Sequence, residues 1–236
     1  GIFKGTECKA VMYTSLLLDL DNTLLDFHAC AEASMNCALE ENQLSHQDGL
    51  FSAFLRINDG LWREIEQGLL TKEQLHQTRW NKIFAEQGIA FDGVVFEKSF
   101  LKYLAQKVFP IEGAYSLLQY LSGKYTVCAV TNGPYEQQQK RLEAANMLPF
   151  FDHLFASEQI GFEKPSENFF DACFAALSDI SPEESMIIGD SITADMMGGL
   201  RYGIQTCWFN YHHAQPPKDI PLTYIVDALE DIKHFL

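Results

Sequence analysis

The sequence predicts an α/β fold, built on a parallel sheet, with an all-helical segment inserted into it. The apolar run at residues 16–18 stops at Asp19, which is typical of a short strand buried on both faces of such a sheet. Similar runs lie near residues 125–131, 152–156, 185–189 and 204–209. Their alternation with helical patterns favours parallel strands. The stretch from Asp19 to Thr131 is far too long for one strand-to-strand connection of about 30 residues, so we expect an insertion there.

The two ends of the chain are less clearly patterned. Residues 223–226 are expected to add a short edge strand before a terminal helix. Residues 1–11 precede the first expected strand and have no evident periodicity, so no function is assigned to them.

The inserted segment is expected to be helical throughout, because its apolar residues recur at helical spacing in four stretches, each forming one apolar face of a helix. These faces are formed by Ala31, Met35, Ala38 and Leu39, by Ile57, Leu61, Trp62 and Ile65, by Leu75, Trp80, Ile83 and Phe84, and by Phe96, Phe100, Tyr103 and Leu104. Residues 71–74 read Thr-Lys-Glu-Gln, a capping box that begins the third helix. The predicted organisation is a core of residues 13–26 and 109–236 with a helical cap of residues 27–108.

Composition excludes some classes of partner. With 17 Lys and Arg against 32 Asp and Glu, the net charge of −15 opposes binding to nucleic-acid polymers and to anionic membranes. No run of about 18 apolar residues is long enough for a membrane helix, and the first residues lack the apolar stretch of a signal peptide. The six cysteines show no paired metal spacing, and several of them lie in apolar stretches where they are interpreted as small core residues. We expect a monomer or homodimer in the reducing cytoplasm.

Two carboxylates follow the first strand directly. Ligands of open α/β sheets bind beyond the carboxyl ends of the strands, where Asp19 and Asp21 would project. An aspartate there can attack phosphorus and form an acyl phosphate, while a second can exchange a proton with the leaving oxygen. The alternative is that this pair only caps a turn, which is the better interpretation of an isolated Asp-x-Asp.

Three later segments add groups suited to a phosphate and a cation. A strand ends at Thr131, Asn132 and Gly133, whose hydroxyl, amide and backbone can donate to phosphate. Lys164 stands before a proline that resists helix continuation, and it could neutralise a transferring phosphoryl group. Further along, the candidates are Asp190 and Ser191 at another strand end and Asp195 in the first turn of a following helix. Singly, Thr131 can be a strand residue, Lys164 a surface charge and Asp190 a helix cap.

Together, and in this order, these segments resemble the four motifs of the haloacid dehalogenase superfamily, from about Tyr13 onward. The resemblance implies a Rossmann-like core with a helical cap, and a Mg²⁺-dependent aspartyl-phosphate mechanism. It implies these roles: Asp19 as nucleophile, Asp21 as general acid/base, Thr131 and Lys164 as ligands of the phosphoryl oxygens, Asp190 with Asp19 and the Asp21 carbonyl as the metal site, Asp195 as a supporting acid, and Thr23, Asn132, Gly133 and Ser191 as further phosphate or substrate contacts.

Departures from relatives of other activities narrow the expected chemistry. Members that dehalogenate lack the second aspartate, so Asp21 indicates phosphate chemistry. Pumps of the superfamily are far longer and carry lysine where this chain has Asn22. The expected activity is therefore that of a phosphatase or phosphomutase.

The cap segment resembles that of the pyrimidine 5'-nucleotidase subfamily, through residues 57–62, 66–68, 71–75 and 79–80. This resemblance implies hydrolysis of (deoxy)pyrimidine nucleoside monophosphates, with specificity set by the cap. Phe27, Trp62 and Trp80 could stack on a base and Arg79 could bind a polar edge. The stronger interpretation is that the aromatic residues pack the core of the cap and that Arg79 is solvated or in a salt bridge. A sugar-phosphate or phosphoglycolate phosphatase, a phosphosugar mutase and a non-catalytic binding protein remain alternatives.

Overall fold

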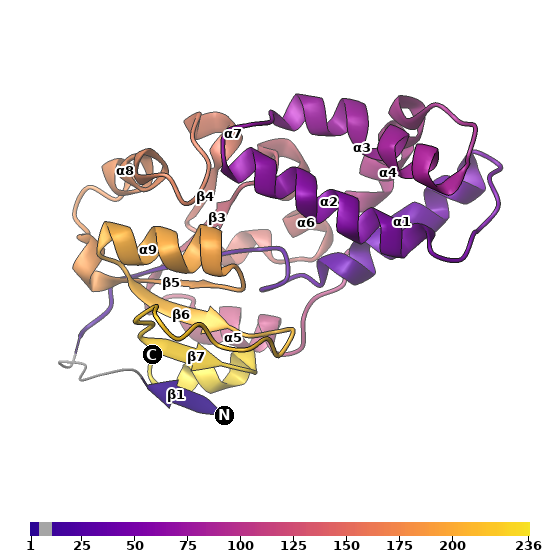
Figure 1. Ribbon diagram of the computed structural model, residues 1–236. Helices are drawn as coiled ribbons and strands as arrows, with labels where there is room; N and C mark the ends of the chain where they lie inside the picture. The colour runs from indigo at the N-terminus through magenta and orange to yellow at the C-terminus, as the bar shows by residue number, and fades with distance from the viewer. Residues whose placement is uncertain (5–10) are drawn as a thin grey trace. The chain divides into compact units, whose positions relative to one another are not determined.

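The computed structural model describes residues 1–4 and 11–236. The chain divides into two compact units, Gly1–Asp26 with Pro110–Leu236 and Phe27–Phe109 (Figure 1). Cys8 lies outside the described residues, and the other five cysteines are free thiols.

The first unit is built on one sheet. Within the described residues its strands are β1 Ile2–Lys4, β2 Ser15–Leu18, β3 Thr126–Thr131, β4 His153–Ala156, β5 Ser185–Gly189, β6 Gln205–Phe209 and β7 Tyr224–Val226. They follow the order β1-β7-β6-β5-β2-β3-β4. All neighbours are parallel except β1 and β7. The predicted α/β class with a parallel sheet is confirmed.

The expectations for the chain ends were partly wrong. Residues 2–4 form β1, which pairs antiparallel with β7 so that Ile2 stands opposite Val226. Strand β7 is therefore flanked on both sides rather than at the edge of the sheet. A three-residue strand is too short to show periodicity, which is why the sequence did not reveal it. The expected terminal helix is a 3-10 helix, η4, at Leu229–His234.

The connections between strands place helices on both faces of the sheet. The helices are α5 Ala114–Leu121, α6 Tyr135–Ala144, α7 Ser157–Ile160, α8 Glu167–Ala176 and α9 Met197–Tyr202. Short 3-10 helices lie at Leu148–Phe150 (η1) and Pro182–Glu184 (η2). Helices α5 and α6 lead toward β3 and β4, whereas α8 and α9 lead back toward β5 and β6. Because parallel crossovers are right-handed, the two pairs cover opposite faces, and α8 and α9 contact each other on theirs (Figure 1).

The same topology selects where a ligand can bind. Strands β2 and β5 are neighbours, yet the connection from β2 leads to one side of the sheet and that from β5 to the other. Beyond the carboxyl ends of such a strand pair, open α/β sheets have a crevice that binds ligands. Asp19 follows β2 and Asp190 follows β5, so both lie at this crevice.

The core of this unit explains the apolar runs. On the α8 and α9 face, Leu17 and Ile187 pack with Phe169 and Phe170 in one buried cluster. Leu16, which points to the opposite face by the alternation of a strand, is also fully buried. Burial on both faces accounts for the continuous apolar character of the strands.

The second unit, all of whose residues are described, consists of four helices. They are α1 Phe27–Glu41, α2 Leu50–Glu66, α3 Lys72–Gln87 and α4 Gly93–Leu104. Thr71 caps α3 with the predicted capping box, accepting from the Gln74 amide while the Gln74 side chain accepts from the Thr71 amide. An aromatic cluster fills the interior, with ring centroids 5.2 Å apart for Phe54 and Trp80 and 4.5 Å for Trp80 and Phe96. Within the described parts of the chain, no helix is long and apolar enough to cross a membrane.

Candidate active site

The loop after β2 holds its polar groups by backbone geometry. The Asp19 amide donates to the Ile188 carbonyl at 3.0 Å, so the pairing with β5 continues past the end of the strand. Asn22 adopts a positive φ of 61°, a conformation that asparagine tolerates well, and its amide donates to the Leu25 carbonyl. This tight turn brings the fully buried Thr23 back beneath Asp19.

Thr23 ties the β2 loop to the β5 loop. Its hydroxyl accepts from the Asp190 amide at 3.1 Å. The same hydroxyl lies 3.2 Å from Asp19 Oδ2 and 3.4 Å from Asp190 Oδ1, within reach as a donor. A hydroxyl has one proton to donate, so these two contacts share it. Thr23 therefore fixes the spacing of two site carboxylates.

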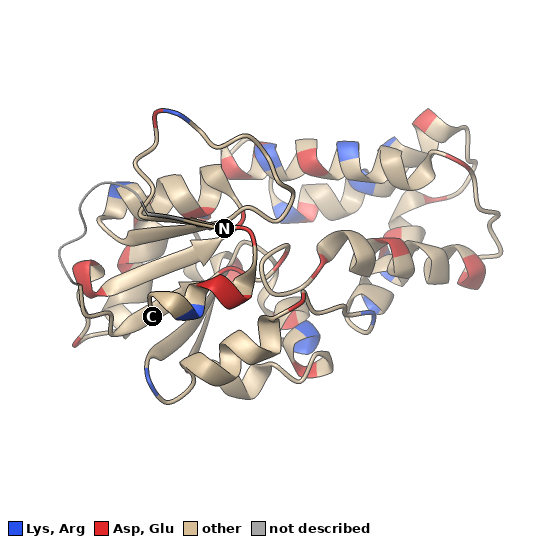
Figure 2. Ribbon diagram, turned by 90° about the horizontal axis from the view of Figure 1, so that it is seen from below, with Lys and Arg blue, Asp and Glu red and all other residues tan. Residues whose placement is uncertain are grey.

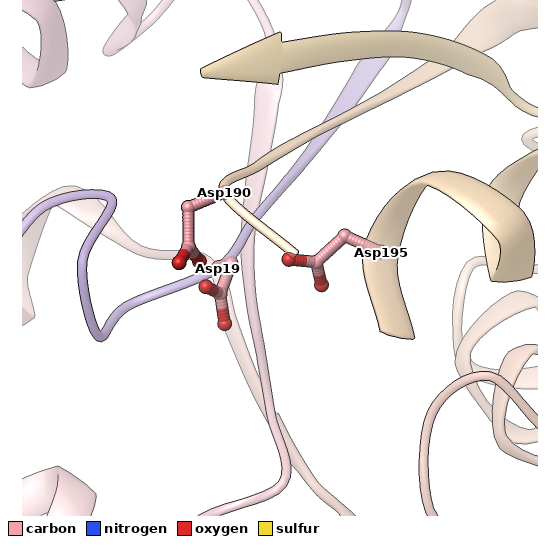
Figure 3. A group of neighbouring side chains, drawn as sticks. All are labelled: Asp19, Asp190 and Asp195. Atoms are coloured by element: carbon pink, nitrogen blue, oxygen red, sulfur yellow. The ribbon is translucent and has the colours of Figure 1, made fainter. Parts of the chain in front are cut away.

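Three carboxylates converge at the crevice. Oxygen atoms of Asp19, Asp190 and Asp195 all lie within 4.8 Å of one another, and the side chains point toward a common centre in Figure 3. Asp195 comes from η3, a π-helical turn at Ile192–Met196 that precedes α9. The expected position of Asp195 in the first turn of a helix is correct, with a wider turn than an α-helix has.

Asp195 is held on both of its oxygens. Oδ1 accepts from Lys164 at 2.7 Å and Oδ2 accepts from the Ser191 amide at 3.2 Å. Gly189 makes this arrangement possible, because a Cβ at that position would lie 2.2 Å from Asp195 Oδ2. The Ser191 hydroxyl accepts from the Ala194 amide as the cap of the turn, so Ser191 rather than Asp190 is the helix cap.

Lys164 lies at the centre of the polar network and is buried. Its Nζ donates to Asp19 Oδ1 at 3.0 Å, to Asp195 Oδ1 at 2.7 Å and to the Val130 carbonyl at 3.0 Å. Asn132 positions the Lys164 backbone by accepting from its amide and donating to its carbonyl. The interpretation of Lys164 as a solvated surface charge is therefore wrong.

The pKa shifts at the site indicate that the negative charge of the three carboxylates exceeds the positive charge of Lys164. Burial, and next the charge of Asp19, raise the pKa of Asp190 well above its usual range. Burial and Asp19 also raise the pKa of Asp195 to about 7, although Lys164 opposes the shift. For Lys164, burial alone would lower the pKa, but the charges of Asp19 and Asp195 outweigh it and raise the pKa.

This excess of negative charge fits a hard divalent cation, whose preferred ligands are carboxylate oxygens. Asp195 already accepts hydrogen bonds from Lys164 and the Ser191 amide, so it is suited to hold these two groups in place. Asp19 and Asp190, held at fixed spacing by Thr23, could hold such a cation.

Asp21 lies beside this cluster and has partners that sequence reasoning missed. Arg141 Nη1 donates to Asp21 Oδ1 at 2.6 Å, and Gln138 Nε2 donates to Asp21 Oδ2 at 3.0 Å. The same Gln138 nitrogen lies 2.8 Å from Thr131 Oγ1, which also accepts from the Gly133 amide at 3.0 Å. The amide of Gly133, expected to face phosphate, is thus directed at Thr131.

A further residue that sequence reasoning missed supports the β5 loop. The indole N–H of Trp208, in β6, donates to the Asp190 carbonyl at 2.8 Å. The available sequence signal was a large amphipathic side chain within a predicted core strand, which by itself does not indicate a partner.

The four candidates in the helical unit have different environments. Trp80 is fully buried in the aromatic cluster, so its surface is taken up by packing rather than open to a base. Arg79 is also buried, where it forms an ion pair with Glu97 and donates to Asn58 Oδ1 at 2.9 Å. For Trp80 and Arg79 the structure therefore favours the packing and salt-bridge interpretations.

Phe27 and Trp62 are only partly buried. Phe27 packs against Phe54 with ring centroids 6.3 Å apart, and Trp62 packs at the edge of the cluster of Leu61, Ile65 and Leu75. Each keeps exposed surface. These two remain the aromatic residues of this unit through which the proposed base stacking can be tested.

Comparison with known proteins shows which family the chain resembles. The haloacid dehalogenase-like hydrolase family matches residues 13–203. The HAD-hydrolase YfnB of Bacillus subtilis is 34% identical over 224 residues, 95% of each chain. Its crystal structure bound to magnesium has a TM-score of 0.89 and covers 95% of this chain and 99% of its own.

Two further relatives are named as pyrimidine 5'-nucleotidases. The pyrimidine 5'-nucleotidase PynA of Streptococcus pneumoniae is 33% identical over 223 residues, 94% of each chain. The pyrimidine 5'-nucleotidase YjjG of Escherichia coli is 31% identical over 186 residues, 79% of this chain and 82% of its own. Given the family match over most of the chain and these identities, the chain is a hydrolase that belongs to the haloacid dehalogenase-like family.

Proposed function

We propose that the protein is a Mg²⁺-dependent phosphatase that forms an aspartyl-phosphate and acts on pyrimidine nucleoside monophosphates. The observation that carries the proposal is the ion pair between Asp19 and the buried Lys164, formed at the carboxyl end of β2 and within reach of Asp190. A carboxylate held beside a cation, at the crevice of an open sheet, is suited to receive a dianionic phosphate.

In the first half-reaction, a carboxylate oxygen of Asp19 attacks phosphorus and forms a new P–O bond. The bond from phosphorus to the ester oxygen breaks, and Asp21 gives a proton to that oxygen as it leaves. Lys164 and the hydroxyl of Thr131 stabilise the charge on the phosphoryl oxygens during this transfer.

In the second half-reaction, water attacks the phosphorus of the acyl phosphate. Asp21, now ionised, takes a proton from the water, and the bond from Asp19 to phosphorus breaks. Inorganic phosphate leaves, Asp19 is a carboxylate again and Asp21 is protonated for the next cycle. The products are the alcohol and phosphate, so the two steps add up to hydrolysis by one water.

Asp19 and Asp190 would hold a divalent cation, which would neutralise charge on the carboxylates and the phosphate so that the two anions can approach each other. The acidic cluster and the raised pKa values of Asp190 and Asp195 support this assignment. Asp195 would keep Lys164 in place while the cation is bound.

The substrate class rests on PynA and YjjG, which are named as pyrimidine 5'-nucleotidases and are similar to this chain in both units. In this proposal the helical unit, Phe27–Phe109, is the cap that contacts the nucleoside. The free thiols of the five described cysteines fit an enzyme of the reducing cytoplasm.

Phosphate release tests the proposal directly. The wild-type protein is incubated with Mg²⁺ and each of dUMP, UMP, dTMP, several sugar phosphates and phosphoglycolate, with and without EDTA. Asp19→Asn removes the nucleophile, and Asp179→Asn, a change at an exposed aspartate, is the matched control. We expect metal-dependent release from the pyrimidine nucleotides that Asp19→Asn abolishes and Asp179→Asn preserves.

Other outcomes separate the parts of the proposal. Release only from sugar phosphates or phosphoglycolate would keep the mechanism and overturn the nucleotide substrate. Interconversion of phosphosugars without release of phosphate would indicate a mutase. No turnover of any of these esters would contradict the phosphatase assignment as a whole.

A further inference from the structure

We propose that Gln138 and Arg141, two residues of α6, are positioning residues that hold the carboxylate of Asp21 for its exchange of protons with the leaving oxygen and with water. The inference rests on the proposed phosphatase function and deepens it. It assigns to α6 a part in the reaction that the four motifs do not include.

The contacts of Asp21 with α6 fix the orientation of its carboxylate. Arg141 Nη1 donates to Asp21 Oδ1 at 2.6 Å and Gln138 Nε2 donates to Asp21 Oδ2 at 3.0 Å. Each oxygen of the carboxylate thus has its own donor, and two donors on different oxygens fix the rotation of the group as well as its position. Asp21 itself is 32% exposed, so without these donors its side chain could turn into solvent.

The two donors are themselves held in place by further contacts. Arg141 Nη1 also donates to Gln138 Oε1 at 3.0 Å, and Gln138 Nε2 contacts Thr131 Oγ1 at 2.8 Å. They stand three residues apart on α6, which puts them on the same face of the helix. The same two side chains of α6 therefore contact both Asp21 and the end of β3.

The guanidinium of Arg141 is buried. The side chain of Arg141 is 2% exposed, and burying a guanidinium is costly unless an anion compensates it. Asp21 supplies that anion at the site of the chemistry, and the pair is not part of the sheet core. The buried charge of Arg141 is better explained by its hold on the Asp21 carboxylate than by packing alone.

Gly133 leaves room for the side chain of Gln138. A Cβ built on Gly133 would lie 2.7 Å from Nε2 and 2.9 Å from Cγ of Gln138. The Gln138 side chain therefore crosses directly over this glycine to reach Asp21 and Thr131. The loop after β3 is shaped so that this one side chain can pass.

A difference between leaving groups makes the role measurable. An alkoxide, such as the nucleoside 5'-oxygen, leaves poorly without a proton, whereas p-nitrophenolate leaves readily without one. Attack of water on the acyl phosphate needs a base whichever ester formed it. A misplaced Asp21 should therefore slow alkyl ester cleavage and dephosphorylation, but not the release of p-nitrophenolate from the first turnover.

The test compares Arg141→Met and Gln138→Leu with Lys140→Met, which removes the same charge from the neighbouring, exposed position of α6. Stopped-flow release of p-nitrophenolate from p-nitrophenyl phosphate gives the burst and the steady-state rate. Steady-state assays with dUMP give kcat and KM. We expect Arg141→Met to lower kcat for dUMP and the steady-state aryl rate about 10²-fold, with KM changed less than about threefold and the burst rate nearly unchanged.

The remaining variants sharpen the result. Gln138→Leu should show the same pattern with a smaller loss, Arg141→Lys should recover part of kcat, and Lys140→Met should behave as wild type. A burst rate that falls as far as the steady-state rate would overturn the positioning role, since a general structural defect slows both phases. An unchanged kcat in both Arg141→Met and Gln138→Leu would also overturn it. A wild-type protein that hydrolyses none of these esters refutes the proposed phosphatase first, and the inference with it.

Discussion

The side chain of Asn132 and the backbone of Lys164 exchange two hydrogen bonds. The Lys164 amide donates to Asn132 Oδ1 at 2.8 Å, and Asn132 Nδ2 donates to the Lys164 carbonyl at 3.1 Å. This pairing joins the loop after β3 to the loop that carries the lysine. Asn132 thereby holds the backbone from which the Lys164 side chain reaches Asp19.

Asn132→Ala should lower activity more than it lowers stability. Loss of two hydrogen bonds is expected to reduce the free energy of unfolding by about 2 kcal/mol. The activity should fall about tenfold or more, because Lys164 is no longer held against Asp19 and the phosphate. Urea denaturation measures the first quantity and phosphate release at saturating substrate the second.

The matched control is Asn210→Ala. Asn210 makes the same kind of double hydrogen bond with the backbone of Ala214, at 2.8 and 2.9 Å, within a loop after β6. It should cost similar stability and leave kcat near that of wild type. Equal losses of kcat in the two variants would argue against a special role for Asn132.

Magnesium should stabilise the protein more at high pH than at low pH. The pKa of Asp195 is raised to about 7, above its unfolded value near 3.8. Such a group stabilises the metal-free fold fully below pH 3.8, and this contribution is lost as the pH rises through about 7. Asp190 shifts in the same direction. Thermal unfolding with Mg²⁺ and with EDTA, across pH 5 to 8.5, should give a metal-induced rise in Tm that grows with pH.

The control for this titration is Asp190→Asn, which removes one of the proposed Mg²⁺ ligands and one of the raised pKa values together. Its Tm should respond little to Mg²⁺ at any pH in the range. A rise in Tm for the wild type that is the same at both ends of the range would contradict the competition between protons and the cation.

The sequence predicted those parts of the site that follow from local patterns. Asp19, Thr131 and Asp190 each end an apolar run, and parallel strands bring such ends to one edge of the sheet whatever the rest of the chain does. The capping box at Thr71 is local in the same sense. These predictions needed no knowledge of long-range contacts.

The parts that were not predicted depend on contacts between distant segments. Arg141 and Asp21 are 120 residues apart in the chain, and α6 carries polar residues at nearly all of its positions, so no apolar face singled out the two that turn inward. The signal available was the spacing of three residues between Gln138 and Arg141 on the helix that follows Thr131. Burial of Arg79 was equally hidden, because its anion, Glu97, comes from the next helix.

Arg79→Met should destabilise the helical unit strongly. Glu97, whose Oε1 also lies 2.8 Å from His76 Nδ1, would be left buried without the guanidinium. Removal of one partner of a buried ion pair costs about 3–5 kcal/mol. Lys82→Met, a change at an exposed position of the same helix, should cost little. Denaturant unfolding checks both. If Arg79→Met instead kept its stability and changed only the preference among nucleotides, the earlier hypothesis that Arg79 contacts substrate would return.

Gly189→Ala should reduce activity through Asp195. The new Cβ would lie 2.2 Å from Asp195 Oδ2, so the carboxylate must move away from the Ser191 amide and from Lys164. Overpacking of this kind is expected to lower the free energy of unfolding by about 1–3 kcal/mol. Because Lys164 then loses one of its two anchoring carboxylates, kcat should fall as well. Phosphate release and urea denaturation on the same preparation measure both effects.

Gly60→Ala provides the opposite case with the same substitution. Gly60 lies inside α2, and a Cβ there would meet nothing within 4 Å. Alanine has the higher helix propensity, so this variant should gain about 0.5–1 kcal/mol of stability while kcat stays at the wild-type level. The pair therefore separates the general effect of replacing a glycine from the specific closeness of Gly189 to Asp195. A Gly189→Ala protein as active as Gly60→Ala would mean that the position of Asp195 is not critical for the reaction.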